Sequence, residues 1–407
     1  MLITDLNELT NLCTLEEKRQ QNTLSLIASE NYMPQDICCS VNILSNKYAE
    51  GYPGKRYYAG CSIIDEIESC AIKACQKLFQ VEYANVQLHS GSQANQAAFL
   101  AVLKPGDRIM GLNFAAGGHL THGHSKNFSG IFFQAQYYTV DPTTEQIDYN
   151  QLEDAVKLHR PKLLIAGASA YPRSIDFAAF AAIAQRHNAV LLADIAHIAG
   201  LVATKQHASP VEHADIITGT THKTLRGPRG GFILAKEAWA KKIDQAVMPG
   251  IQGGPHMHTI AQKAACFLEA HTQGFVSYQE QVIQNARALA RELQSQGFTL
   301  VSDGTDTHLL IIKTEPLGLT GREAEERLEK IGITASRSSI PFDKASPLVT
   351  SGLRLGTAAI TTRGMQAEHM REIAECIYLA LCQDNPTVAK ERITQLARAF
   401  PIPERYL

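Results

Sequence analysis

The residue with the clearest chemical potential in this chain is Lys223, within the segment Thr218–Gly231. β-Branched residues precede the lysine, and a turn rich in glycine and arginine follows it before an apolar run, residues 232–234. This pattern predicts a strand, a tight loop and a second strand, with Lys223 at the end of the first strand. A lysine partly withdrawn from water becomes a nucleophile that can form a Schiff base. A lone lysine beside a hairpin can equally be an ordinary surface residue, so this interpretation needs a second group.

Asp194 supplies that second group, 29 positions before the lysine. It ends the apolar segment Val190–Asp194, which predicts a buried strand, and His197 follows three positions later. A carboxylate at the carboxyl end of a strand can keep a pyridine nitrogen protonated, while a lysine holds the aldehyde of the same molecule. The pair therefore predicts a site for pyridoxal 5′-phosphate. The alternative is that Asp194 only caps the segment that follows it.

Two further stretches are typical of ligand-binding loops. Residues 90–92, Ser-Gly-Ser, follow a short predicted strand (84–89) and open a predicted helix (96–102). The free N–H groups and the dipole at such a helix start suit a phosphate. Residues 47–60 are dense in glycine and tyrosine and include Glu50, which indicates a binding surface, with simple packing as the alternative.

Strands that are apolar throughout alternate with helices along most of the chain, which predicts an α/β fold with a mostly parallel sheet. We expect further strands at 108–111, 130–133, 137–140, 162–166, 216–221, 231–235 and 309–313. We expect helices at 63–79, 149–158, 177–187, 322–331 and 366–382, and a long helical region at 260–296 that links two domains. The expected division is an N-terminal arm with helices (1–45), a large domain that binds the cofactor (46–275) and a small C-terminal α+β domain (276–407).

Composition narrows the class of protein. A chain of 407 residues is longer than a single hydrophobic core usually serves, so we expect two domains. A net charge of −2 attracts neither nucleic acid nor an anionic membrane. Nine cysteines at irregular spacings predict neither a disulfide framework nor a metal site, and they favour a reducing cytosol. The first 21 residues lack the pattern of a targeting segment, and no apolar run has membrane-spanning length, so we expect a cytoplasmic protein.

Seven segments stand out in collinear order from near residue 20 to the C-terminal helices: residues 25–31, 46–58, 89–95, 117–123, 194–201, 220–231 and 349–357. Together they closely resemble the serine hydroxymethyltransferase family. The resemblance implies a fold-type I pyridoxal-phosphate enzyme with a mostly parallel seven-stranded sheet, working as a homodimer. It also implies reversible transfer of the hydroxymethyl group of L-serine to tetrahydrofolate, giving glycine and 5,10-methylenetetrahydrofolate.

The same resemblance implies a role for each matching residue. Lys223 would carry the cofactor, Asp194 would pair with its ring nitrogen, His119 would stack on its ring, and Glu50 and Tyr58 would assist catalysis. The other residues implied to bind the cofactor are Ser90, Gly91, Ser92, Ser169, His197, Thr220, His222, Tyr48, and Gly253 and Gly254 from the neighbouring subunit. Those implied to bind the amino acid are Ser29, Tyr48, Glu50, Tyr57, Tyr58 and Arg354, whose planar guanidinium suits a carboxylate. Those implied to bind folate are Phe114, Gly118, Leu120 and Ser338. Arg354 could instead be half of a core ion pair.

The chain departs from the family in the implied folate pocket. Phe114 stands where the family usually has leucine, and Ala116 stands where it has a polar residue. Residues 336–338, Ser-Arg-Ser, replace Asn-Lys-Asn. A serine offers one hydroxyl where an asparagine both donates and accepts, so we expect weakened folate affinity.

Two other functions stay open on the sequence. One is a folate-independent pyridoxal-phosphate aldolase or transaldolase acting on β-hydroxy amino acids. The other is a nucleotide-binding module without lysine chemistry, against which the chain has no G-x-G-x-x-G after its first strand.

Overall fold

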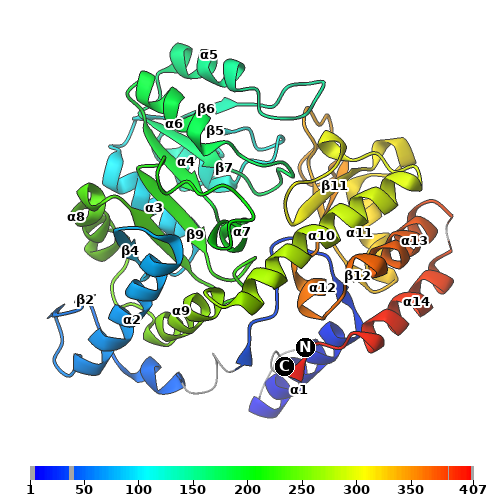
Figure 1. Cartoon of the computed structure of the whole chain (residues 1–407), viewed down its shortest axis with the longest axis horizontal. Coiled ribbons are helices and arrows are strands. Elements are labelled where there is room, and N and C mark those ends of the chain that lie inside the picture. The colour runs from blue at the N-terminus through cyan, green and yellow to red at the C-terminus, as the bar shows by residue number, and fades with distance from the viewer. Residues whose placement is uncertain (1–4, 36–40, 384, 405–407) are drawn as a thin grey trace.

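A central sheet of seven strands organises the larger part of the molecule in the computed structural model, which describes residues 5–35, 41–383 and 385–404 (Figure 1). The strand order is β4-β10-β9-β8-β7-β5-β6, and the five strands from β9 to β6 run parallel. Strand β10 lies antiparallel to both β4 and β9. The strands are β4 (Tyr83–Asn85), β5 (Arg108–Leu112), β6 (Gln134–Tyr138), β7 (Leu163–Gly167), β8 (Val190–Asp194), β9 (Ile216–Thr220) and β10 (Gly231–Ala235). The predicted mostly parallel sheet is confirmed.

Helices cover both faces of this sheet, as expected where the central strands are apolar throughout. Alternate residues of β7 point to opposite faces: Leu164 packs with the core under α2, α5, α6 and α9, and Leu163 packs with the core under α3 and α8. These helices are α2 (Ser62–Phe79), α3 (Gly91–Val102), α5 (Tyr149–His159), α6 (Phe177–Arg186), α8 (Glu237–Gln245) and α9 (Met257–Ala270).

The carboxyl ends of the parallel strands meet at one edge of the sheet, and this edge positions the site. In the register of β7, β8 and β9, Asp194 lies beside Gly167 on one side and Thr218 on the other. Helix α3 begins at the same edge, because Gly231 at the start of β10 hydrogen-bonds the Leu88 carbonyl just before the helix. The short helix α7 (Ala199–Ala203) follows β8.

A smaller antiparallel sheet, in the order β11-β14-β13, belongs to the C-terminal part of the chain (Figure 1). Helix α10 passes between the two sheets and contributes buried residues to the cores on both sides. The C-terminal strands are β11 (Leu309–Lys313), β12 (Ile333–Thr334), β13 (Ser336–Ser338) and β14 (Gly352–Gly356). The helices are α10 (Gln273–Ser295), α11 (Gly321–Lys330), α12 (Ala358–Thr362), α13 (Met370–Leu381) and α14 (Pro386–Ala399).

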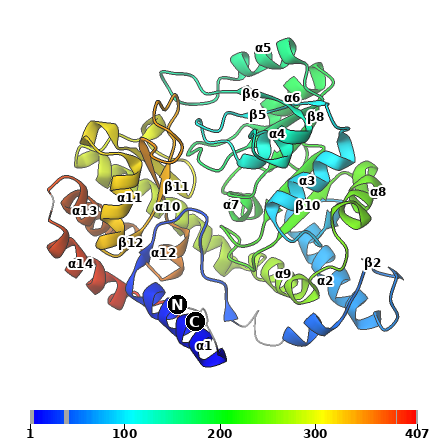
Figure 2. The ribbon, with the colours of Figure 1, turned by 180° about the vertical axis from the view of Figure 1, so that it is seen from behind.

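The N-terminal segment packs on this C-terminal part (Figure 2). Helix α1 (Leu6–Asn22) begins at Asp5, whose carboxylate accepts a hydrogen bond from the Glu8 N–H. Strand β1 (Leu24–Ser25) then pairs in parallel with β12, and Leu24 is fully buried in the C-terminal core. The Arg363 guanidinium donates to backbone carbonyls at the ends of both α1 and α14, which fixes the two helices side by side. The predicted domain boundaries stay a prediction.

One expectation about an element was wrong. Residues 130–133 are not a strand, because Asn127 caps a short helix, α4 (Phe128–Phe132), by accepting from the Ser129 N–H. The helical region predicted over 260–296 consists of two helices, because Thr272 caps α10 and separates it from α9. No helix in the described ranges is long and apolar enough to cross a bilayer.

Candidate active site

A cavity of about 340 Å³ opens at the carboxyl edge of the central sheet, between the start of α3 and the C-terminal part of the chain. It brings together residues that lie up to 325 positions apart, from Ser29 to Arg354. Twelve residues predicted for the cofactor or the amino acid line it: Ser29, Ser90, Gly91, Ser92, His119, Ser169, Asp194, His197, Thr220, His222, Lys223 and Arg354. Asn95, Ala168, Ala196 and Arg229 complete the lining.

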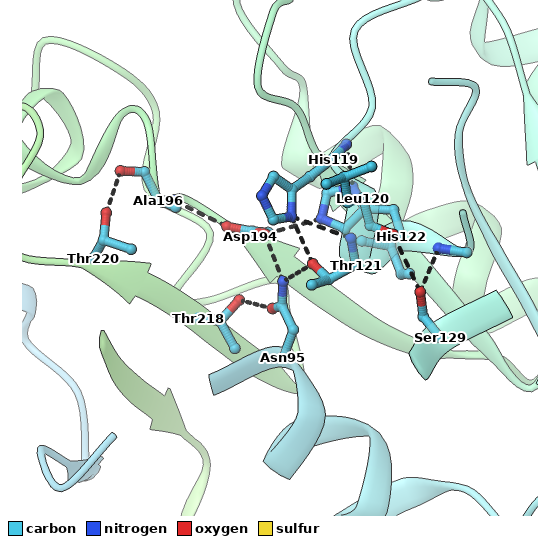
Figure 3. A network of polar contacts seen from close by, with 12 residues as sticks. Asn95, His119, Leu120, Thr121, His122, Ser129, Asp194, Ala196, Thr218 and Thr220 are labelled. Carbon is cyan, nitrogen blue, oxygen red and sulfur yellow. Dashed lines mark hydrogen bonds and ion pairs between the residues drawn. The ribbon is translucent and has the colours of Figure 1, made fainter. Parts of the chain in front are cut away.

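Asp194 is buried at the floor of the cavity and is held by three hydrogen bonds (Figure 3). Its Oδ2 accepts from His122 Nε2 and from Asn95 Nδ2, both at 2.9 Å, and its Oδ1 accepts from the Ala196 N–H at 3.0 Å. Burial acts to raise the pKa of this carboxyl, but the hydrogen bonds from His122 and Asn95 hold it well below its usual range. Asp194 therefore offers a fixed negative charge to the cavity, beyond the capping of its own loop.

The partners of Asp194 are themselves held, which fixes their orientation (Figure 3). Thr218 Oγ1 donates to Asn95 Oδ1 at 2.6 Å, so the amide of Asn95 points its nitrogen at Asp194. The His119 N–H lies 3.4 Å from His122 Nδ1, which leaves the His122 proton on Nε2, facing Asp194. Thr121 Oγ1 bridges Asn95 Nδ2 and His119 Nδ1, each at 2.7 Å.

His119 lies above Asp194 with its ring open to the cavity. Burial lowers the pKa of His119 to about 4, and the neighbouring His122 and the cations Lys223 and Arg354 act in the same direction. The ring is therefore neutral at physiological pH, which suits stacking on another aromatic ring.

Lys223 follows β9 by three residues, and its amino group faces the same cavity. Nζ lies 3.4 Å from Thr220 Oγ1 and makes no ion pair with any carboxylate of the described chain. Burial lowers the pKa of Lys223 to about 8, Asp194 opposes this shift, and Arg354 and Arg229 add to it. About a tenth of the amine is therefore unprotonated at pH 7, far more than for a lysine with its ordinary pKa, as a nucleophilic lysine requires.

Arg354, on β14, closes the cavity from the C-terminal part. Its Nη1 donates to the Ser169 carbonyl at 2.8 Å, while its Nε and the Ser169 Oγ are buried and have no hydrogen-bond partner in the part of the chain that the structure describes. Within that part Arg354 forms no ion pair, so the alternative of a core ion pair is not observed. A buried guanidinium with a free donor points to an anionic ligand.

The start of α3 offers a second anion-binding point. Ser90 caps the helix by accepting from the Gln93 N–H, and the first N–H groups of the helix, at Gly91 and Ser92, have no partner within it. A Cβ on Gly91 would meet Thr220 Cγ2 at 2.6 Å, so this close approach requires glycine. The N–H groups, the helix dipole and the serine hydroxyls match the needs of a phosphate.

Taken together, the cavity fits pyridoxal 5′-phosphate. Among its lining residues stand three cations, Lys223, Arg229 and Arg354, against one carboxylate, Asp194. This charge pattern suits a ligand with a phosphate, a carboxylate and one protonated ring nitrogen.

The remaining residues predicted for the cofactor and the amino acid lie outside this cavity. Four of them lie in a segment that we call the tyrosine loop: Tyr48, Glu50, Tyr57 and Tyr58. The other two, Gly253 and Gly254, lie against this loop. The rings of Tyr48 and Tyr58 lie 5.2 Å apart, and the Glu50 carboxylate raises the pKa of the Tyr58 phenol. A Cβ on Gly253 would meet Glu50, and one on Gly254 would meet Tyr48, both at 2.9 Å. The tyrosine loop is thus assembled within one chain but does not reach the cavity of that chain.

The residues predicted for folate are also absent from the lining of this cavity. Phe114 and Leu120 are 37% and 43% exposed, and Gly118 packs against the backbone of β5. Ser338, on β13, donates its hydroxyl hydrogen to the carbonyl of Ser339 at 3.0 Å, so its only donor is used locally.

Sequence reasoning assigned no role to Asn95, His122, Arg229 or His308. Asn95 and His122 hold Asp194, Arg229 lines the cavity, and the buried His308 ring stacks on His197 at 5.5 Å. Both Asn95 and His122 lie within segments already singled out, 89–95 and 117–123. The available signal was their spacing, four positions from Gly91 for Asn95 and three from His119 for His122.

We expect His122→Phe to lower the affinity for pyridoxal phosphate, because the substitution removes a hydrogen bond to Asp194. Without the charge-assisted hydrogen bond the pKa of Asp194 rises, and the affinity of the apoenzyme for pyridoxal phosphate falls by about 10- to 150-fold. Spectrophotometric titration of the apoenzyme measures this. His124→Phe is the control, because that ring contacts Phe114 and does not bond Asp194, so an equal loss in both variants would contradict the assigned role.

Comparison with protein families agrees with this geometry. The family model described as serine hydroxymethyltransferase matches residues 3–377 of the 407.

Proposed function

Because this chain belongs to the serine hydroxymethyltransferase family of fold-type I pyridoxal-phosphate enzymes, we propose that it reversibly transfers the hydroxymethyl group of L-serine to tetrahydrofolate. The products are glycine and 5,10-methylenetetrahydrofolate. The observation that supports this most is the meeting of Lys223, Asp194 and Arg354 in one cavity whose other cation is Arg229.

Each of these residues has a separate task. When bound, pyridoxal phosphate supplies a protonated pyridine ring that takes up the electron pair of the bond being broken. Asp194 keeps the ring nitrogen protonated, and its own position is fixed by His122 and Asn95. Lys223 would hold the aldehyde group of the cofactor between turnovers and would give way to the amino group of serine. The start of α3, with Ser90 and Ser92, holds the phosphate.

Orientation of the amino acid falls to Arg354. A guanidinium bound to the substrate carboxylate by two parallel hydrogen bonds fixes rotation about the Cα–N bond of serine. This contact would orient the bond to the hydroxymethyl carbon for cleavage. The free Nε of Arg354 is available for this contact.

We propose that the proton of the serine hydroxyl is handled by Glu50 of a neighbouring subunit. Glu50 lies in the tyrosine loop, outside the cavity of its own chain. A two-fold dimer in which each loop enters the partner's cavity completes both sites at once. Tyr48, Tyr57 and Tyr58, which are 56%, 75% and 45% exposed, would then be covered by the partner.

The altered folate pocket leads to a specific expectation for Ser338→Asn. The serine hydroxyl is already donated to the Ser339 carbonyl, whereas an asparagine amide both donates and accepts. Satisfying one more buried polar group on folate lowers the KM for tetrahydrofolate by about 5- to 150-fold. Steady-state assays at fixed serine measure this. Ser338→Ala is the control and should leave the KM unchanged, and an unchanged KM in Ser338→Asn would place folate elsewhere.

One assay separates the proposed function from the aldolase alternative. Glycine release from serine and acetaldehyde release from allo-threonine are measured with and without tetrahydrofolate. We expect folate to accelerate serine cleavage and to leave allo-threonine cleavage nearly unchanged. If folate neither binds nor accelerates serine cleavage while the aldolase reaction proceeds, the chain is a folate-independent aldolase.

A further inference from the structure

Lys263, on α9, is a buried cation that lies outside the cavity and has no part in the proposed mechanism. Its side chain is 1% exposed, and its Nζ donates to the carbonyls of Val86, Leu88 and Gly231 at 2.7, 2.8 and 2.8 Å. An ammonium has three donors and a neutral amine has two, so only the charged form can donate to all three carbonyls at once. Within the described residues Lys263 forms no ion pair with a carboxylate.

A buried charge without an ionic partner is costly, so its bonds must serve the surrounding structure. Val86 and Leu88 lie in the segment that joins β4 to the start of α3, and Gly231 begins β10. The Gly231 N–H donates to the Leu88 carbonyl at 3.0 Å, so Lys263 reinforces a junction that the backbone already makes.

This junction lies directly beneath the start of α3. A Cβ on Gly231 would meet the Ser90 carbonyl at 2.3 Å, and a Cβ on Gly230 would meet Lys263 Cε at 2.4 Å. Because these two glycines have no side chain, Lys263 can pack against Gly230 and the Ser90 carbonyl can pack against Gly231. Any shift of these two glycines would move the N–H groups of Gly91 and Ser92 at the cavity wall.

We propose that Lys263 is a positioning residue that fixes the start of α3 for the phosphate group of the cofactor. This inference rests on the proposed role of residues 90–92. Lys263 holds the segment from one side while the phosphate binds on the other, and it does not touch the ligand. Its positive charge also adds a favourable potential for an anion at the helix start.

The charges around Lys263 make the junction sensitive to pH. Burial lowers the pKa of Lys263 to about 7, and Glu68, Cys75 and Cys266 oppose this shift. Burial raises the pKa of both thiols, so they stay neutral, and Glu68 pairs with Arg56 at 2.6 Å. Burial lowers the pKa values of His89, His222 and His256, and the charge of Lys263 acts in the same direction. Above its pKa Lys263 retains two donors for three carbonyls.

The test compares the affinities of the apoenzyme for pyridoxal phosphate and for pyridoxal, which lacks the phosphate. Lys263→Met should lower the affinity for pyridoxal phosphate about 10-fold or more and the affinity for pyridoxal less than about 3-fold. In the wild type the preference for the phosphorylated ligand should fall as the pH rises from about 7 to 9, and in Lys263→Met it should stay flat.

Phe267→Leu is the matched control, because Phe267 is fully buried on the same helix and packs on Phe232 of β10. It should loosen the core without changing the preference between the two ligands. If Lys263→Met does not fold, Lys263→Gln and the wild-type pH profile carry the test. Equal losses for both ligands, or a wild-type preference that does not change with pH, would overturn the proposal. Failure of the wild type to bind pyridoxal phosphate would instead refute the proposed function.

Discussion

Lys223→Ala should abolish covalent attachment of pyridoxal phosphate and lower kcat by on the order of 10⁴-fold or more. Among the residues that line the cavity Lys223 is the only lysine, so no neighbouring amine can replace it. Borohydride reduction of the loaded enzyme followed by peptide mapping measures attachment, and glycine release from serine measures turnover. A reduced adduct on a different lysine would show that the site is assigned wrongly.

Lys223→Arg separates the charge of this residue from its nucleophilicity. Arginine keeps a cation near Asp194 but cannot attack an aldehyde, so this variant should bind the cofactor without a covalent bond. The wild-type lysine should attach the cofactor faster as the pH rises through about 8, because its lowered pKa sets the fraction of neutral amine. A rate of attachment that falls over this range would contradict a nucleophilic amine.

Mixing two inactive variants should restore activity if the tyrosine loop serves the partner subunit. Glu50→Gln disables the loop and Lys223→Ala disables the cavity. In a hybrid dimer one site then carries both substitutions and the other carries neither. After unfolding and refolding an equal mixture, we expect about one quarter of the wild-type activity, since half of the dimers are hybrid and each has one intact site.

The control mixture combines Asp194→Asn with Lys223→Ala, two substitutions that alter the same cavity of one chain. Every site in this mixture keeps one defect, so no activity should return. Sedimentation of the refolded mixtures checks that dimers form in both. Absence of recovery in the first mixture, with dimers present, would mean that each site is complete within one chain.

The parts of the site that could be predicted from sequence are those fixed by local patterns. An apolar run that ends in Asp194, and a β-branched run before Lys223, each show a strand and the loop at its carboxyl end. The parallel sheet then places both loops at one edge. The bond between His122 and Asp194 crosses 72 positions and leaves no local periodicity, so only the folded chain reveals it.

The error at residues 130–133 and the unpredicted break within 260–296 also have a physical cause. Residues 130–133 form an apolar run too short to distinguish a buried strand from a turn of helix, and the cap at Asn127 decides the outcome. The break between α9 and α10 depends on Thr272, whose side chain accepts from the Phe275 N–H. Caps of this kind shift the ends of helices without disturbing the apolar pattern that predicts them.

The pairing of β1 with β12 has a consequence for biosynthesis. Leu24 and Leu26 leave the ribosome about 300 residues before Ile333, which belongs to the strand that covers them. At 5–20 residues per second, these leucines wait roughly 15–60 s for their partner. During that time a nascent chain presents an apolar N-terminal segment that a chaperone can bind, and the C-terminal core closes only when the last third of the chain has emerged.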